Sequence, residues 1–333
     1  MRPNKIAVVG AGTAGLPEAA VLASAPGTDG SPPPRVVVLQ RRSPENEWKV
    51  DAINAGKSPL GGIEPGVDDL VAAAVGRGTL SASTDLHECR DAQAVLVCVG
   101  TDRQGLLPEY GGLMEALGGV AAALKQRPGL TRPLVMIEST VAPSTMQTVI
   151  GPYIEGQGLV DGRDLMLGHS PRHVRRGRAV DDLRGQTRLV SGLRAETPVT
   201  AASFYRRFLT RGRILVTSSL TAEVAHTLAS AWEDVRHAFA SEIARHCERL
   251  DVDYLTLRDQ VNDVLRWPDA MRPSDAMFGG DALPIPAGGV GGPCLPRDGI
   301  LLWWRALEAG HLSRNSIILA ARAVNDASPA ATV

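Results

Sequence analysis

Two short segments of the chain carry residue types suited to chemistry. Residues Gly10-Ala11-Gly12-Thr13-Ala14-Gly15 have the spacing G-x-G-x-x-G, and Cys294 stands close to Asp298 in the segment GGVGGPCLPRD. The glycines permit a tight turn, let a pyrophosphate approach the backbone and let a helix pack closely on a sheet. A cysteine attacks aldehydes readily when positive charge or backbone N–H groups activate it. The glycine motif therefore predicts a dinucleotide site, and Cys294 is of a residue type that can act as a nucleophile. The alternatives are a glycine-rich turn without a ligand and an inert buried thiol.

The glycine motif needs a strand before it and a helix after it, and the sequence supplies both. Ile6 to Val9 is a short β-branched run, and an Ala-rich helix is expected after the motif as far as Ser24. Apolar runs at 36–39, 94–99 and 134–137 are predicted strands, separated by helical stretches. This alternation predicts an α/β fold with a Rossmann-like, doubly wound parallel sheet.

The chain after residue 200 follows a different pattern. Thr221 to Leu250 contain no glycine or proline, and apolar residues recur there at helical spacing. We expect one long helix of about 45 Å. A region rich in proline and glycine follows, and a last helix is expected from about 299 to 325. We predict an NAD(P)-binding Rossmann-like domain at 1–200 and a helical central domain at 201–333, which carries the cysteine loop.

Composition excludes several classes of protein. The 333 residues are 44% hydrophobic and 21% charged, as in a globular chain. The net charge of −1 gives no electrostatic case for nucleic acid or an anionic membrane as partner. Four scattered cysteines predict neither a disulfide framework nor a zinc site, so we expect no metal and a cytoplasmic location. The N-terminus could pass for a signal peptide, but the nucleotide motif explains its glycines better.

The end of the second predicted strand bears on the choice of cofactor. An acidic residue there would bind the adenosine ribose of NAD, but the chain has Gln40, Arg41 and Arg42. The two arginines could pair with the 2′-phosphate of NADP. Alternatively, Gln40 holds a ribose hydroxyl and the arginines are solvated. Gln40 and Arg41 are predicted cofactor-binding residues, and NAD and NADP both remain open.

Several segments, in order along the chain, together resemble the UDP-glucose/GDP-mannose dehydrogenase family. They are GAGTAGLPEA (10–19), AINAGKSPLGGIEPGVDDL (52–70), VLVCVGTD (95–102), IESTVAP (137–143), AEVAHTLASAWEDVRHAFASEIARHCERLDVD (222–253) and GGVGGPCLPRD (288–298). The family oxidises a primary alcohol of a sugar to a carboxylate, with two NAD per turnover and a cysteine-bound thiohemiacetal and thioester. The resemblance implies an oxidoreductase of this kind, with a sugar-like small molecule as substrate and a homodimer as its assembly.

The resemblance implies individual catalytic residues. Cys294 would be the nucleophile, Asp298 its partner near the reacting oxygen, and Thr140 the residue that orients water. His226 stands where the family has a catalytic lysine, and Ser230 where it has an asparagine. A lysine stabilises an oxyanion at every working pH, whereas His226 does so only when protonated, although neutral it could act as a base. We predict both as catalytic residues.

The remaining predicted contacts also come from the resemblance. Along the cofactor, beside the glycine loop, we expect Thr101, Glu138 and Ser139. Arg172 replaces a family glutamate and cannot be a general base. We predict that Arg172 and Gly291 bind the substrate. The arginine-rich loop at 169–178 could bind an anionic group, or it is a solvated loop balanced by Asp181 and Asp182.

The end of the chain suggests how the substrate differs. Residues 325–329 resemble the linker after the family's central domain, so we expect the C-terminal nucleotide-sugar-binding domain to be absent. Three interpretations follow: a substrate other than a nucleotide sugar, a domain supplied by another chain, or lost catalysis. The first predicts oxidation of a sugar, nucleoside or glycoside, to the carboxylate or aldehyde, in a specialised bacterial pathway. The alternatives are a catalytically impaired binding or regulatory protein, and a single-step alcohol dehydrogenase without a covalent intermediate.

Overall fold

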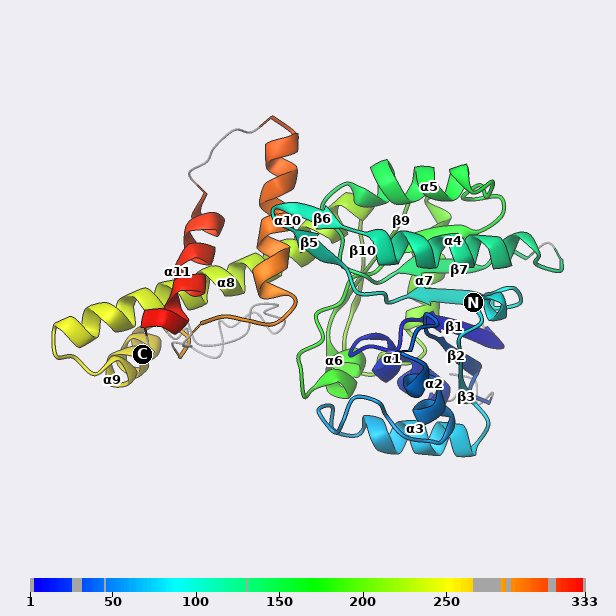
Figure 1. Cartoon of the computed structure of the whole chain (residues 1–333), viewed down its shortest axis with the longest axis horizontal. Coiled ribbons are helices and arrows are strands. Elements are labelled where there is room, and N and C mark those ends of the chain that lie inside the picture. Colours follow the sequence, from blue (N-terminus) through cyan, green and yellow to red (C-terminus); the bar gives the residue numbers. More distant parts are fainter. Residues whose placement is uncertain are drawn as a thin grey trace. The chain divides into compact units, whose positions relative to one another are not determined.

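The computed structural model describes residues 3–25, 32–44, 46–129, 131–265, 283–285, 289–310 and 316–331. The chain forms two compact units (Figure 1). Unit 1 comprises residues 1–101 and 110–223, and unit 2 comprises residues 102–109 and 224–333. Unit 1 includes the chain as far as residue 223, and its strand at 214–216 pairs with the strand at 188–192. The hairpin at 102–109, which the sequence analysis did not anticipate, belongs to unit 2.

An eight-stranded sheet with the order β10-β9-β8-β7-β4-β1-β2-β3 forms the centre of unit 1. Its strands are β1 (Lys5–Val9), β2 (Arg35–Leu39), β3 (Leu80–Ser83), β4 (Ala94–Val97), β7 (Leu134–Ile137), β8 (Met166–His169), β9 (Arg188–Gly192) and β10 (Ile214–Val216). Every neighbouring pair is parallel except β8 and β9. Because β1 has β2 on one side and β4 on the other, the winding reverses there, as in a Rossmann fold. The predicted fold class is confirmed.

Alternate residues of the central strands β1, β2, β4 and β7 pack into two separate apolar cores. Ile6 and Val8 belong to one core and Ala7 and Val9 to the other, as expected of parallel strands covered on both faces. The first core receives α1 (Gly15–Ser24), α2 (Glu47–Asn54), α3 (Val67–Gly76), α6 (Ala179–Gly185) and α7 (Glu196–Tyr205). The second receives η1 (Leu86–Cys89), α4 (Gly111–Lys125), η2 (Met146–Ile150) and α5 (Gly151–Gly156). The unit is therefore a three-layer sandwich.

Unit 2 is built on helices. The 31-residue α8 (Ser219–Arg249) confirms the predicted long helix. The other elements are α9 (Tyr254–Leu265), α10 (Leu295–Glu308), α11 (Ile317–Ala331) and a hairpin of β5 (Asp102–Gln104) and β6 (Leu107–Glu109). Helix α10 contacts both α11 and the hairpin. In the part of the chain that the structure describes, no helix is long and apolar enough to cross a membrane.

Candidate active site

The glycine loop lies between β1 and α1, at the carboxyl edge of the sheet. Gly10 has a φ of 113°, and a Cβ there would lie 2.6 Å from the backbone oxygen of Cys98. A Cβ on Gly15 would lie 2.1 Å from the Gly10 oxygen, so both positions require glycine. At exposed Gly12, a Cβ would meet no atom within 4 Å. Thr13 and the N-cap residue Ala14 lead into α1, and the positive end of the dipole of this helix suits a phosphate. The cradle fits a dinucleotide.

Gln40 braces this loop from the end of β2. Its Oε1 accepts a hydrogen bond from the Ala11 N–H at 2.9 Å. The next two residues are exposed arginines, and each has an acidic neighbour. Arg41 lies 3.3 Å from Glu115, and Arg42 lies 3.0 Å from Glu47. The carboxylates partly offset the positive charge that a 2′-phosphate would require.

The segments that follow β4 and β7 are hydrogen-bonded to each other at the carboxyl edge of the sheet. Thr101 donates from Oγ1 to the Thr140 backbone oxygen at 2.7 Å. Ser139 donates from Oγ to the Val99 oxygen, also at 2.7 Å. Thr101 and Ser139 are buried, and Thr140 is half-buried. In a parallel sheet, ligands bind at the carboxyl ends of the strands, beside the switch point. The structure therefore places Thr101, Ser139 and Thr140 at the edge that carries the glycine loop.

Glu138 and Arg172 lie inside unit 1, in a group of four charged side chains. The Arg172 Nη2 atom lies 2.5 Å from a carboxylate oxygen of Glu18 and 2.5 Å from one of Glu138. Arg188 contacts the same two carboxylates. None of the four side chains is more than 8% exposed. We call Glu18, Glu138, Arg172 and Arg188 the four-charge cluster.

The two carboxylates of the cluster differ in their response to burial. Burial raises the pKa of Glu18 to about 8, although Arg172 opposes the change. Burial also acts against the ionisation of Glu138, but Arg172 and Arg188 outweigh it and lower the pKa of Glu138 to about 2. Arg172 thus has both of its carboxyl partners inside unit 1. Its predicted contact with a substrate gains no support from this geometry.

The guanidinium of Arg172 obstructs metal binding at the cluster. Glu18, Cys98 and Glu138 offer three ligand atoms close enough to share a cation. The guanidinium of Arg172 already lies against both carboxylates, and its Nη2 atom is 3.6 Å from the Cys98 sulfur. The arginine therefore takes the place that a metal ion would fill.

Unit 2 holds the cysteine loop. Cys294 is exposed and is the N-cap residue of α10, and Asp298 lies buried one turn later in the same helix. The backbone N–H of Asp298 donates to the Cys294 oxygen at 2.8 Å. Gly292, just before the cysteine, has a φ of 87°, a conformation that favours glycine. Gly291 is exposed, and nothing lies within 4 Å of its Cβ position.

Three side chains surround the carboxylate of Asp298. Ser230 donates from Oγ to Oδ2 at 2.8 Å, and Arg297 donates from Nε to Oδ1 at 2.7 Å. The Nε2 atom of His226 lies 3.8 Å from Oδ2. His226 and Ser230 share one face of α8 because they are four residues apart. We call these four residues the Asp298 network. With Cys294, it brings four of the predicted catalytic residues together in unit 2.

The electrostatics of this site favour a neutral thiol. Burial raises the pKa of Asp298, while Arg297 and Ser230 act in the opposite direction. The pKa of the Cys294 thiol is also raised, because surrounding protein displaces water from it and because the Asp298 carboxylate is near; Arg297 opposes this. A protonated thiol needs a base before it can attack. The Asp298 carboxylate and the His226 imidazole are the groups at hand.

Sequence reasoning missed three residues of these two groups. Arg297 was visible as the neighbour of Asp298 within the quoted cysteine segment. Glu18 was visible as the single acidic residue in the otherwise apolar stretch of α1. Burial of a carboxyl group is unfavourable unless a partner is buried with it. Arg188 gave no such signal, since a charged residue at the start of a strand is ordinary.

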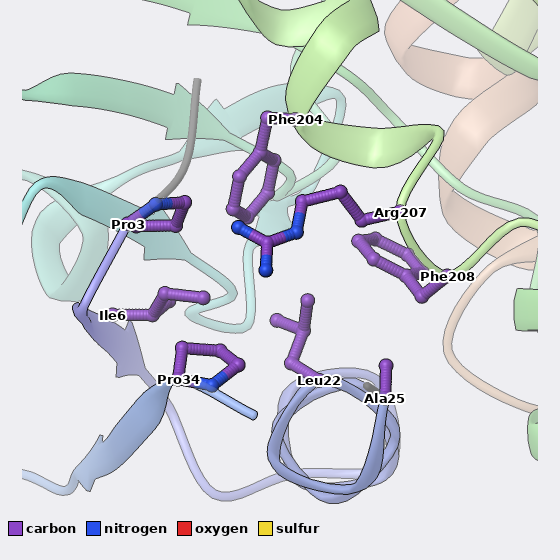
Figure 2. Close-up of a pocket in the computed structure, with 8 residues that line it drawn as sticks. All are labelled: Pro3, Ile6, Leu22, Ala25, Pro34, Phe204, Arg207 and Phe208. Carbon is purple, nitrogen blue, oxygen red and sulfur yellow. The ribbon is translucent and has the colours of Figure 1, made fainter. Parts of the chain in front are cut away.

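Figure 2 shows the side chains around a small hollow in unit 1, among them Ile6, Leu22, Phe204 and Phe208, with the guanidinium of Arg207 pointing in between them. Its volume is about 10 Å³, which is room for roughly one water molecule. Ile6 lies near the amino end of β1, opposite the edge that carries the glycine loop. The hollow is therefore separate from the candidate dinucleotide site.

Comparison with known proteins yields a consistent result. The NAD binding domain of the UDP-glucose/GDP-mannose dehydrogenase family matches residues 4–209, and the central domain of that family matches residues 220–327. The chain is 29% identical over 98% of its length to a UDP-N-acetyl-D-mannosamine dehydrogenase of Pyrococcus horikoshii, of which it spans 69%. It is 30% identical over 97% of its length to an NDP-N-acetyl-D-galactosaminuronic acid dehydrogenase of Ralstonia nicotianae, again spanning 69%.

Two solved structures are similar along nearly the whole chain. One is a UDP-D-ManNAc dehydrogenase of Pyrococcus horikoshii, with a TM-score of 0.82 and 28% identity, covering 98% of this chain and 69% of that one. The other is an NDP-N-acetyl-D-galactosaminuronic acid dehydrogenase of Methanosarcina mazei, with a TM-score of 0.78 and 28% identity. It covers 99% of this chain and 67% of that one.

Proposed function

Because this chain belongs to the UDP-glucose/GDP-mannose dehydrogenase family, and is thereby an NAD-dependent oxidoreductase, we propose that it oxidises a primary alcohol of a sugar-like substrate to a carboxylate. Cys294 is the nucleophile of this reaction. The observation that carries the proposal is the exposed thiol of Cys294 at the start of α10, one turn before the buried carboxylate of Asp298. The relatives' names point to nucleotide sugars as the first substrates to test.

The residues of unit 1 are suited to hold NAD. Backbone N–H groups of the glycine loop would bind the pyrophosphate, and Gln40 would keep that loop in shape. NAD, when bound, accepts hydride from the carbon being oxidised. We favour NAD over NADP because Glu115 and Glu47 stand beside Arg41 and Arg42 and would repel a 2′-phosphate.

The residues of unit 2 are suited to handle protons and the covalent step. The Asp298–His226 pair would take the proton of the alcohol as it becomes an aldehyde. The Cys294 sulfur then bonds to the aldehyde carbon while the thiol proton passes to the aldehyde oxygen, which forms a thiohemiacetal. A second oxidation gives a thioester, and water replaces sulfur to release the carboxylate and restore the thiol. Thr140 is proposed to orient that water.

Replacement of Cys294 by serine tests this scheme. Wild-type protein with NAD and UDP-N-acetyl-D-mannosamine, UDP-glucose or a nucleotide-free glycoside is expected to form two NADH per carboxylate. Cys294→Ser is expected to form no carboxylate, whereas Cys247→Ala, at a buried thiol of α8, should match the wild type. One NADH per product with full activity in Cys294→Ser would indicate a single-step dehydrogenase. Binding of cofactor without turnover on any substrate would indicate an impaired enzyme.

We also propose that the protein is a homodimer formed through α8, and that it works in the cytoplasm, where its four free thiols stay reduced. Leu228, Trp232 and Phe239 are spaced to share one helix face and are about half exposed. A second copy would offer the same stripe, which is the requirement of a two-fold interface. Light scattering should show a dimer that Trp232→Glu converts into a monomer. A monomeric wild type would refute the proposal.

A further inference from the structure

The loop that carries Cys294 is tied on its carboxyl side by an arginine far away in the sequence. Arg103, in strand β5 of the hairpin, donates from Nε to the Pro296 backbone oxygen at 3.1 Å. Pro296 lies in the first turn of α10, two residues after the cysteine. The Nη1 atom of Arg103 donates to the Gly105 oxygen at 2.5 Å, which fixes the guanidinium against its own hairpin. This side chain therefore anchors the backbone directly after Cys294.

A second arginine ties the same loop on its amino side. Arg322, in α11, donates from Nη2 to the Val290 backbone oxygen at 3.0 Å. Its Nη1 atom donates to Asp234 of α8 at 2.6 Å, and its Nε atom donates to Asp326 at 3.0 Å. The side chains of Arg322 and Asp234 are 6% and 4% exposed. The guanidinium is thus held by two carboxylates and presents its remaining donor to the loop, four residues before Cys294.

The loop itself offers little rigidity. Gly289 has a φ of 124° and Gly292 a φ of 87°, and glycine backbones lose more conformational freedom on ordering than any other residue. Cys294 is exposed, so side-chain packing does not fix its position. The carbonyls of Val290 and Pro296 lie on opposite sides of the cysteine in the chain. Hydrogen bonds at both carbonyls restrict the segment between them.

We propose that Arg103 and Arg322 are positioning residues that hold Cys294 for its reaction, each through a backbone carbonyl on one side of it. The proposal rests on the proposed function, in which the Cys294 thiol reacts with an aldehyde. Neither arginine acts on the thiol through its charge. The charged groups that shift the pKa of Cys294 are Asp298 and Arg297. A change in thiol reactivity after loss of Arg103 therefore reports movement of the loop rather than loss of a neighbouring charge.

Alkylation of Cys294 by iodoacetamide, followed by mass spectrometry across a range of pH, measures this effect without any substrate. Arg103→Met removes the donors and keeps the length of the side chain. Arg322→Lys keeps a positive charge for buried Asp234 but loses the donor to Val290, so the fold is preserved. Arg103→Lys retains one donor and should restore part of the wild-type behaviour. Arg305→Met, which removes a surface pair with Glu308 on the same helix, is the matched control.

A released thiol gains water and moves away from Asp298, so its pKa should fall towards the ordinary value. We expect alkylation at neutral pH to become about threefold faster in Arg103→Met and Arg322→Lys. We expect carboxylate formation to fall about tenfold, because a misplaced nucleophile reacts poorly. Arg305→Met should change neither quantity.

Two results would overturn the proposal. One is an alkylation profile of Arg103→Met and Arg322→Lys that matches Arg305→Met. The other is slower carboxylate formation with an unchanged profile, since the arginines would then act elsewhere than on the thiol. Failure of the proposed function looks different: Cys294→Ser would keep forming carboxylate, whatever the alkylation profiles of the arginine variants show.

Discussion

The four-charge cluster of unit 1 and the Asp298 network of unit 2 are both buried groups of charged and polar side chains, but they are completed differently. In the cluster, Glu18 and Glu138 each face both Arg172 and Arg188, so each side chain finds its partners within the group. In the network, Asp298 is held by Ser230 and Arg297, and the exposed Cys294 begins the same helical turn. One group is closed, and the other adjoins a nucleophile that solvent can reach.

This difference separates two kinds of departure from the family. Arg172, which the family resemblance implies to replace a glutamate, lies in the closed cluster against Glu18 and Glu138. His226 and Ser230, which it implies to replace a lysine and an asparagine, both lie around Asp298. A changed polar position is therefore no sign of lost catalysis by itself. The meaning of such a change depends on its surroundings. A new side chain can be paired within a closed group, or it can lie beside a reactive group.

Restoring the family's glutamate at Arg172 should have the largest effect. Arg172→Glu would place three carboxylates around Arg188 in a buried site, which we expect to lower the free energy of unfolding by about 4 kcal/mol. Urea denaturation followed by circular dichroism measures it. Arg176→Glu makes the same charge change at an exposed position of the same loop and should cost far less. If Arg172→Glu cannot be purified folded, Arg172→Met gives the measurement. Equal stability of the Arg172 and Arg176 variants would contradict the closed cluster.

Removing the charge of Asp298 should affect catalysis more than folding. Asp298→Asn keeps the size of the side chain, and we expect carboxylate formation to fall about 100-fold, because the site loses its base. Because buried Arg297 loses its partner charge, the melting temperature should also fall, so activity is compared at a temperature where both proteins remain folded. Asp259→Asn, at an exposed residue of α9, is the control. A variant that turns over normally would remove Asp298 from the mechanism.

The cluster should also make stability depend on pH. Because burial raises the pKa of Glu18 to about 8, the folded protein keeps a proton that the unfolded chain releases near its ordinary pKa of 4.5. This contribution to stability is complete below that pKa and is lost as the pH rises through 8. We expect the contribution of Glu18 to the free energy of unfolding to fall by about 3 to 4 kcal/mol between roughly pH 5 and pH 8.

Glu18→Gln should remove this decline, and exposed Glu155→Gln should keep it. Above pH 5 the contribution of Glu138 no longer changes, since its pKa is lowered to about 2. Burial lowers the pKa of His169 to about 4, and its contribution is common to the wild type and both variants, so the difference between them reports Glu18. A decline that persists unchanged in Glu18→Gln would show that another group causes it.

The fold was predictable because its signals are local. The apolar runs of β1, β2, β4 and β7 are short and separated by helical stretches, and parallel strands buried on both faces need no alternation. The glycine motif was predictable for a similar reason. Its glycines permit a tight turn and close packing between residues that are near in the sequence, and the Cβ clashes at Gly10 and Gly15 agree with this.

The pairings across the fold were not predictable from local signals. Arg172 meets Glu18, which is 154 residues away, only because the strand order brings the start of α1 towards the loop after β8. The hairpin at 102–109 is too short to show a strand pattern, and its contact between Arg103 and Pro296 spans 193 residues. Strand β10 likewise belongs to unit 1 because it pairs with β9, and its three residues give no local signal of this pairing.

The smallest expected effect tests whether the Asp298 network depends on each of its hydrogen bonds. Ser230→Ala removes the donor to a buried carboxylate oxygen, which should cost about 1 kcal/mol of stability and raise the pKa of Asp298 further. Ser230→Asn, the residue of the family, retains a donor and should recover most of the loss. Ser81→Ala, on the exposed edge strand β3, should change nothing. If Ser230→Ala matched Ser81→Ala in both stability and turnover, the hydrogen bond from Ser230 to Asp298 would contribute to neither. The contact with Arg297 would then be sufficient to hold Asp298.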